Sequence, residues 1–185
     1  VAEVLSANGV YTYLFADLRP TPELSFSVRE LGCDFGIVLT ASHNPKEYNG
    51  YKVYWNDGGQ LVPPHDKAVI EKVRATSFQD IRWDANEALI ETVGIELDEK
   101  YTDMIAGLSL SNTGKNDLNI VFTALHGTSI VSVPPALAKA GFKNVQLVEA
   151  QSTPDGNFPT VESPNPEESA ALAMAVAQAE ATGAD

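Results

Sequence analysis

Apolar residues occur in short runs along the chain, separated by glycine-, proline- and asparagine-rich stretches that mark turns. Runs rich in β-branched and aromatic residues predict strands, and apolar residues spaced three or four apart predict helices. The predicted strands are 10–15, 35–39, 51–55, 89–95, 119–123 and 145–148. The predicted helices are 1–7, 21–31, 63–75, 98–108, 129–139 and 167–182. This order predicts an α/β fold.

Some details of the predicted helices and turns follow from single residues. Thr21 is expected to cap its helix, with Pro22 in the first turn. The stretch 56–59 is a turn, and 60–62 is expected to return as a partner of the strand before it. The helix over 63–75 is expected to bury a stripe consisting of Ala68, Val69, Ile70 and Val73.

A polar stretch at 109–119 interrupts the pattern, which then restarts with a strand. It predicts a linker between two domains, 1–110 and 118–185. Each is expected to be a partial three-layer α/β/α domain with a mixed, mainly parallel sheet. No internal repeat or low-complexity tract is found in the sequence.

Composition narrows the choice of partners. Apolar residues make up 44% of the 185 residues, enough for a packed core. The chain has 12 Lys and Arg residues and 25 Asp and Glu residues, which gives a net charge of −13. This negative charge argues against non-specific binding to nucleic acid. The single cysteine, Cys33, is expected to be a small core residue in a reducing compartment, and no apolar run is long enough to span a membrane. A cytoplasmic location is therefore expected.

Polar groups gather after the predicted strand 35–39. The segment 40–45 places a hydroxyl, an imidazole and a carboxamide in a row, on Ser42, His43 and Asn44. Loops that follow strands are where open α/β sheets place their chemistry. A second polar cluster, 48–52, follows within a few residues. We interpret Ser42 as the residue that carries a phosphoryl group.

Two other interpretations of this segment were weighed. A serine hydrolase lacks support, because the Gly-x-Ser-x-Gly elbow is absent and a histidine adjacent in sequence is poorly placed as a base. A polar turn that caps a helix through Ser42 or Asn44 remains open. Against that simple turn, Arg19, Tyr48 and Lys52 lie close enough in sequence to line the same mouth.

The segment Thr-Ala-Ser-His-Asn-Pro at 40–45, followed by Tyr-Asn-Gly-x-Lys at 48–52, resembles the active-site segment of the α-D-phosphohexomutases. These are the phosphoglucomutases and phosphomannomutases. Other stretches resemble the branch that handles glucose and pentose phosphates, and these are 18–22, 57–60, 125–128 and 154–159. The resemblance covers nearly the whole chain.

The resemblance implies a parent enzyme that interconverts sugar 1-phosphate and sugar 6-phosphate, with glucose expected and mannose or pentose phosphates as alternatives. Ser42 would carry the phosphoryl group, and a bisphosphate such as glucose 1,6-bisphosphate would be the intermediate and activator. Mg²⁺ would bind the phosphate on Ser42 and three aspartates of an Asp-x-Asp-x-Asp-Arg loop expected after Asp185. The chain is thus expected to be the later part of domain 1 and the first half of domain 2, and to be inactive alone.

The resemblance and the chemistry of the side chains assign further roles. Lys52 can neutralise phosphate or move a proton, although a strand-edge lysine that only promotes solubility is the alternative. His43 is expected to act in catalysis or only to orient the loop, and Asn44 and Arg19 to contact phosphate. For His126 we favour a structural role in a turn over a place at a domain interface.

Overall fold

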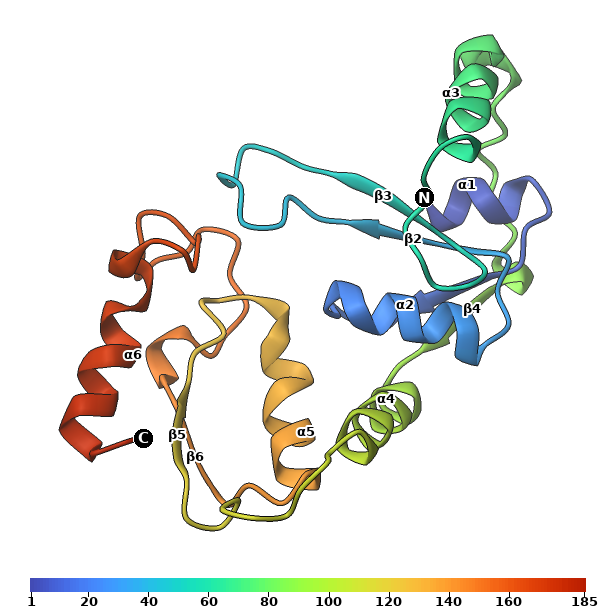
Figure 1. Ribbon diagram of the computed structural model, residues 1–185. Helices are drawn as coiled ribbons and strands as arrows, with labels where there is room; N and C mark the ends of the chain where they lie inside the picture. The colour runs from blue at the N-terminus through green and yellow to red at the C-terminus, as the bar shows by residue number, and fades with distance from the viewer.

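The computed structural model describes residues 1–185 and confirms an α/β fold (Figure 1). The helices are α1 (Ala2–Ala7), α2 (Thr21–Glu30), α3 (His65–Ala75), α4 (Ile95–Gly107), α5 (Val133–Lys139) and α6 (Ser169–Thr182). The strands are β1 (Thr12–Phe15), β2 (Phe35–Leu39), β3 (Tyr51–Trp55), β4 (Ile90–Val93), β5 (Asn119–Phe122) and β6 (Asn144–Leu147). Short 3-10 helices are η1 (Phe78–Asp80), η2 (Glu87–Leu89), η3 (Thr128–Val131) and η4 (Glu149–Gln151).

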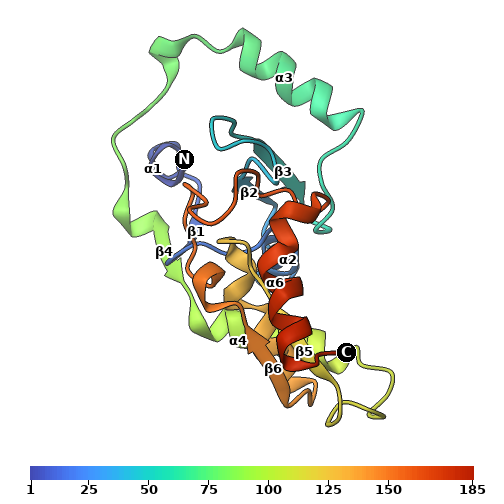
Figure 2. The ribbon, with the colours of Figure 1, turned by 90° about the vertical axis from the view of Figure 1, so that its left-hand side faces the viewer.

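The strands form three pairs. β1 pairs with β4 and β5 pairs with β6, both in parallel, whereas β2 and β3 form an antiparallel hairpin. Figures 1 and 2 show β5 and β6 between α6 on one side and α5 on the other, which is a three-layer arrangement. The expected mixed and mainly parallel pairing of strands is confirmed, because two pairs are parallel and one is antiparallel.

The β2–β3 hairpin lies on α2. At Gly36 in β2, an added Cβ would come 2.5 Å from Val28, so the absence of a side chain lets the strand approach the helix. The turn that follows β3 is fixed to the same helix, because Ser25 Oγ donates a hydrogen bond of 2.6 Å to the Gly58 carbonyl. Gly58 has φ of +80°, a conformation that glycine adopts without steric cost.

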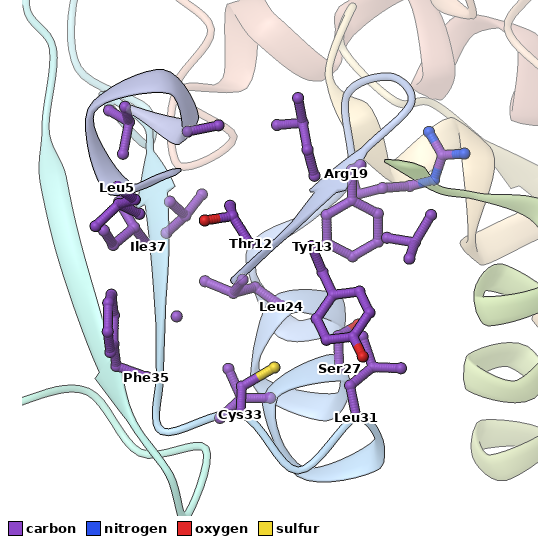
Figure 3. Close-up of a pocket in the computed structure, with 18 of the residues that line it drawn as sticks. Leu5, Thr12, Tyr13, Arg19, Leu24, Ser27, Leu31, Cys33, Phe35 and Ile37 are labelled. Atoms are coloured by element: carbon purple, nitrogen blue, oxygen red, sulfur yellow. The ribbon is translucent and has the colours of Figure 1, made fainter. Parts of the chain in front are cut away.

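A small core joins α2 to α4. Phe26, Leu97 and Tyr101 form it, with the rings of Phe26 and Tyr101 5.4 Å apart. Between β1 and β2 lies a cavity of about 710 Å³, lined mostly by apolar side chains of α1, β1, α2 and β2 (Figure 3). The two sheets of the N-terminal half are therefore separate, each with one strand edge toward this cavity.

The expected core stripe of α3 is wrong for this chain. Val69, Ile70 and Val73 are 41%, 47% and 63% exposed, and no residue of the helix is buried. Figures 1 and 2 both show α3 projecting away from the sheets. The whole chain exposes 11861 Å², against about 8,600 Å² for a compact monomer of its 19.8 kDa. The apolar spacing of α3 is real, but no layer lies against it.

Several predicted element ends were also wrong. Thr21 is the first residue of α2 and makes no capping bond, because Pro20 occupies the N-cap position. α4 begins at Ile95, after Gly94, rather than at Asp98. The expected helix over 129–139 is divided into η3 and α5, and the two prolines Pro134 and Pro135 lie in the first turn of α5, where no backbone N–H is needed. The return of 60–62 is reduced to a single bridge, between Tyr54 and Gln60.

Polar contacts hold the predicted linker and the second half in place. Lys115 is buried, and its ammonium donates to Ser109 Oγ, to Asn112 Oδ1 at 3.2 Å and to the Ala140 carbonyl at 2.8 Å. Lys139 of α5 forms an ion pair of 2.7 Å with Asp103 of α4. The predicted boundary between 110 and 118 stays a prediction. None of the helices is long and apolar enough to cross a membrane.

Candidate active site

The hairpin of β2 and β3 presents the predicted phosphoryl carrier at its open end. Leu39 pairs with Tyr51, and beyond this pair the Thr40 N–H donates to the Gly50 carbonyl at 3.0 Å. The residues between Thr40 and Gly50 form a loop, and Ser42 lies exposed within it. The strand that the sequence predicts thus delivers the serine to solvent, as expected for a residue that reacts.

The backbone at Ser42 is unusual. Its φ is +58°, in the left-handed region that non-glycine residues adopt at a cost of about 1–3 kcal/mol. The Ser42 N–H donates a bond of 3.0 Å to Thr40 Oγ1, which helps to hold this conformation. Ser42 Oγ lies 3.4 Å from Nδ1 of His43, which is a weak contact. Such strained positions cluster at functional sites.

Gly50 closes the loop by a tight approach. A Cβ built there would lie 2.3 Å from the Thr40 carbonyl oxygen, a distance that no side chain can accept without a shift of the backbone. The Asn49 side chain accepts a bond of 2.9 Å from the Gly50 N–H. Sequence reasoning quoted Thr40 and Gly50 within the motif but assigned neither a role, because close approach of backbones is not visible in a pattern of residues.

The remaining candidates lie around this loop. His43 and Asn44 are exposed beside Ser42, and the Asn44 N–H donates to the Ala41 carbonyl at 3.1 Å. Lys52 is half-buried on β3, opposite Val38 of β2. Lys52 makes no ion pair and no hydrogen bond to Ser42 in this structure. Its ammonium thus has no partner in this structure, and its contact with a phosphate stays a prediction.

Arg19 is engaged elsewhere. Its Nε and Nη2 each donate a bond of 2.7 Å to one carboxylate oxygen of Asp98 in α4, and Nη1 donates to the Leu18 carbonyl at 2.9 Å. This contact holds the pKa of Asp98 below its usual range and raises the pKa of Arg19. The structure does not bring Arg19 to Ser42, so a phosphate would compete with a paired carboxylate for this side chain.

Sequence reasoning missed a buried polar chain in the second half. Nδ1 of His126 lies 3.1 Å from the Thr153 carbonyl, which can only accept, so Nδ1 carries the proton. Nε2 then accepts from the Thr160 hydroxyl at 2.8 Å, and that oxygen accepts from Gln151 Nε2 at 3.0 Å. Gln151 Oε1 accepts from the Thr123 hydroxyl at 2.6 Å. His126 is 5% exposed, in agreement with the structural role favoured for it.

This chain of bonds fixes the loop after η4 against the end of β5. Figures 1 and 2 both show that loop on the same side of the molecule as the β2–β3 loop. Leu125 and His126, which follow β5, have φ of +47° and +58°. Phe158, in the loop after η4, has φ of +50°. The second half thus presents a hydrogen-bonded loop on the side of the molecule where the β2–β3 loop lies.

Comparison with known proteins decides the family. The model for domain I of phosphoglucomutase/phosphomannomutase, an α/β/α domain, matches residues 1–80, and that for domain II matches residues 99–185. This chain belongs to the phosphoglucomutase/phosphomannomutase family. The Ser42 loop lies in the part of the chain that the domain I model matches.

Relatives of the family carry both names. A "Probable phosphomannomutase" of Haemophilus influenzae is 40% identical over 190 residues, which is 100% of this chain and 38% of the relative. A "Phosphoglucomutase" of Staphylococcus haemolyticus is 39% identical and covers 97% of this chain and 33% of its own length. The chain therefore spans about a third of the length of these curated relatives.

Solved structures agree with the family's fold. A Thermus thermophilus protein described as a "putative phosphomannomutase" superposes with a TM-score of 0.75 and 26% identity, over 96% of this chain and 38% of that one. A family member from Burkholderia thailandensis superposes with a TM-score of 0.71 over 98% of this chain and 38% of that one, and at 24% identity it supports the fold alone.

The residues present do not by themselves fit a magnesium ion. Mg²⁺ requires a near-octahedral set of oxygen ligands. No group of three or more His, Cys, Asp or Glu side chains is placed to hold a metal in this structure. Among the candidate residues, Ser42 could supply a metal ligand only through the oxygens of a phosphate bonded to it. No step of the chemistry below is therefore assigned to the metal.

Proposed function

We propose that the full-length protein interconverts sugar 1-phosphate and sugar 6-phosphate, with glucose as the sugar. Membership of the family and the likeness to relatives named phosphoglucomutase support this proposal. The single observation that carries it is the exposed Ser42, held in a strained conformation at the open end of the β2–β3 hairpin. Mannose or pentose phosphates are the alternative substrates, since relatives of similar identity are named for mannose.

The proposed reaction uses this chain's residues as follows. In the resting enzyme a phosphoryl group is bonded to Ser42 Oγ. A sugar hydroxyl attacks the phosphorus, the O–P bond to Ser42 breaks, and Ser42 Oγ leaves with the bonding electrons and takes up a proton. The proton of the sugar hydroxyl passes to a base, for which Lys52 is the candidate. The bisphosphate then turns round, and its other phosphoryl group returns to Ser42 Oγ by the reverse steps.

The other side chains would provide position and charge. Phosphoserine carries about −1.5 to −2 charge at pH 7, so a cation nearby is needed in a chain whose net charge is −13. Lys52 on the neighbouring strand is the candidate for this as the alternative to its role as the base, and His43 beside the serine would orient the loop or contact the phosphate. Asn44 would donate its amide to a phosphate oxygen. Mg²⁺ dependence is proposed from the family alone.

The proposal is tested on the full-length protein, purified without phosphatase treatment. Intact-mass measurement and peptide mapping should locate one phosphate on Ser42. Ser42→Ala should lose both the phosphate and mutase activity, measured with glucose 1-phosphate and glucose 1,6-bisphosphate. Ser111→Ala, at an exposed serine of the linker, is the matched control and should keep both. Full activity in Ser42→Ala, with phosphate at another residue, would reject the proposal.

A further inference from the structure

One carboxyl group is buried without any of the partners that a carboxylate requires. Glu23, in the first turn of α2, is 0% exposed, and neither of its oxygens has a hydrogen-bond donor within reach. Leaving an ionised carboxylate in this state costs far more than leaving a neutral acid there. The chemistry assigned to Ser42 makes no use of this group.

The surroundings of Glu23 contain one cation, already paired. Arg19, from the loop after β1, gives two hydrogen bonds of 2.7 Å to Asp98 in the first turn of α4. The side chains of this pair are only 12% and 15% exposed. Tyr101, also on α4, is the other titratable group that Glu23 influences, and Asp17 faces Arg19 from the same loop. Figure 3 shows Arg19 extending beyond the end of β1.

We infer that Glu23 is a buried, uncharged acid in the folded protein, beside the Arg19–Asp98 pair. In this arrangement the cluster holds one positive and one negative charge, and the neutral acid adds none. A second carboxylate at this place would be buried without a partner and would lower the stability of the fold.

The expected titration agrees with the geometry. Burial, followed by the neighbouring Asp98, raises the pKa of Glu23 to about 8, and Arg19 opposes this only in part. The same contacts, led by Arg19, hold the pKa of Asp98 below its usual range. The two carboxyl groups of one cluster thus titrate far apart, with the proton on Glu23.

The sign of the effect on stability follows from proton binding. The folded protein keeps a proton on Glu23 up to about pH 8, whereas the unfolded chain releases it near 4.5. The free energy of unfolding therefore falls as the pH rises between these two values, and this contribution is lost above pH 8. Glutamine in place of Glu23 keeps the shape and the neutral charge, so it should remove this slope.

The test uses the full-length protein and two readouts. Infrared difference spectra should show a protonated carboxyl band that disappears with a midpoint near pH 8, and Glu23→Gln should lack it. Thermal unfolding of Glu23→Gln should be flatter with pH than that of the wild type, and the variant should be more stable near pH 8. Glu23→Ala, which removes a fully buried side chain, should be less stable than Glu23→Gln at every pH. Glu96→Gln, at an exposed glutamate of α4, is the control and should behave as wild type.

Several outcomes would overturn the inference. A band that persists in Glu23→Gln would assign the buried proton to another residue. Equal pH slopes for the wild type and Glu23→Gln would show that Glu23 is ionised in the folded state. Failure of Glu23→Gln to fold would count against the inference as well, because a neutral amide should replace a neutral acid.

Discussion

At the scale of single residues, the candidate site depends on a loop whose backbone is more constrained than its sequence suggests. Ser42 takes a left-handed conformation, held by Thr40 Oγ1, and Gly50 presses against the Thr40 carbonyl. The serine, the histidine and the asparagine were predicted from their row of functional groups together with the resemblance to a family motif, and their roles stay predictions. The support given by Thr40 and Gly50 could not be predicted, because it consists of backbone approach and not of side-chain chemistry.

Lys52 is expected to act in phosphoryl transfer rather than in folding. In the full-length enzyme, Lys52→Met should lower kcat by at least about 10²-fold, the lower end for an acid–base group. The melting temperature should change little, as for most substitutions that leave the core intact. The comparison is with Lys46→Met, at an exposed lysine of the loop that carries Ser42, which should keep its kcat. A folded Lys52→Met enzyme with unchanged kcat would show that this lysine only promotes solubility.

Gly50→Ala should destabilise the protein, because the new Cβ would lie 2.3 Å from the Thr40 carbonyl oxygen. Forcing an extra carbon into an occupied site costs about 1–3 kcal/mol. Gly107→Ala is the matched control: no atom lies within 4 Å of its Cβ position at the end of α4, and alanine favours the helix by up to about 1 kcal/mol. Urea unfolding of both variants measures the difference, and equal stabilities would contradict the close approach seen at Gly50.

At the scale of elements, the apolar runs predicted all the strands of the structure. The errors concern the ends of helices and the burial of α3. The residue before Pro22 looked like a cap, but the chain enters α2 one residue earlier, at Pro20. α4 begins after Gly94, a residue that pattern alone had assigned to a strand. Helical spacing correctly predicted α3, yet spacing identifies a stripe without showing whether another layer covers it.

We therefore expect the burial of an apolar side chain, and not its helical spacing, to decide how much its truncation destabilises the protein. Leu97→Ala should cost about 2–5 kcal/mol, because Leu97 is 5% exposed in the core between α2 and α4. In the 185-residue chain, Val73→Ala should change stability by no more than about 0.5 kcal/mol, because Val73 is 63% exposed. Denaturant unfolding of this chain tests both. A large loss from Val73→Ala would show that α3 packs against the rest of the chain in solution.

At the scale of the whole molecule, the 185-residue chain carries the predicted phosphoryl-carrying loop but no cluster of metal-ligating side chains. It should not turn over substrate alone, since positioning of reactants is worth about 7–11 kcal/mol of barrier and no cluster of metal ligands accompanies Ser42. The assay adds magnesium, glucose 1-phosphate and glucose 1,6-bisphosphate to the purified chain and follows glucose 6-phosphate. Sustained turnover that disappears in Ser42→Ala would contradict this prediction.

The gap between β1 and β2 also bears on how copies of this chain behave toward one another. Each strand has a single partner, so two rows of backbone N–H and C=O groups border the cavity between them. Free strand edges can pair with those of another molecule, and a net charge of −13 opposes such contacts by repulsion. Salt screens that repulsion beyond about 8–10 Å. Light scattering of the 185-residue chain should therefore rise as salt is added, because the screened chains would associate more readily. The colloidal stability of the chain would then depend on ionic strength.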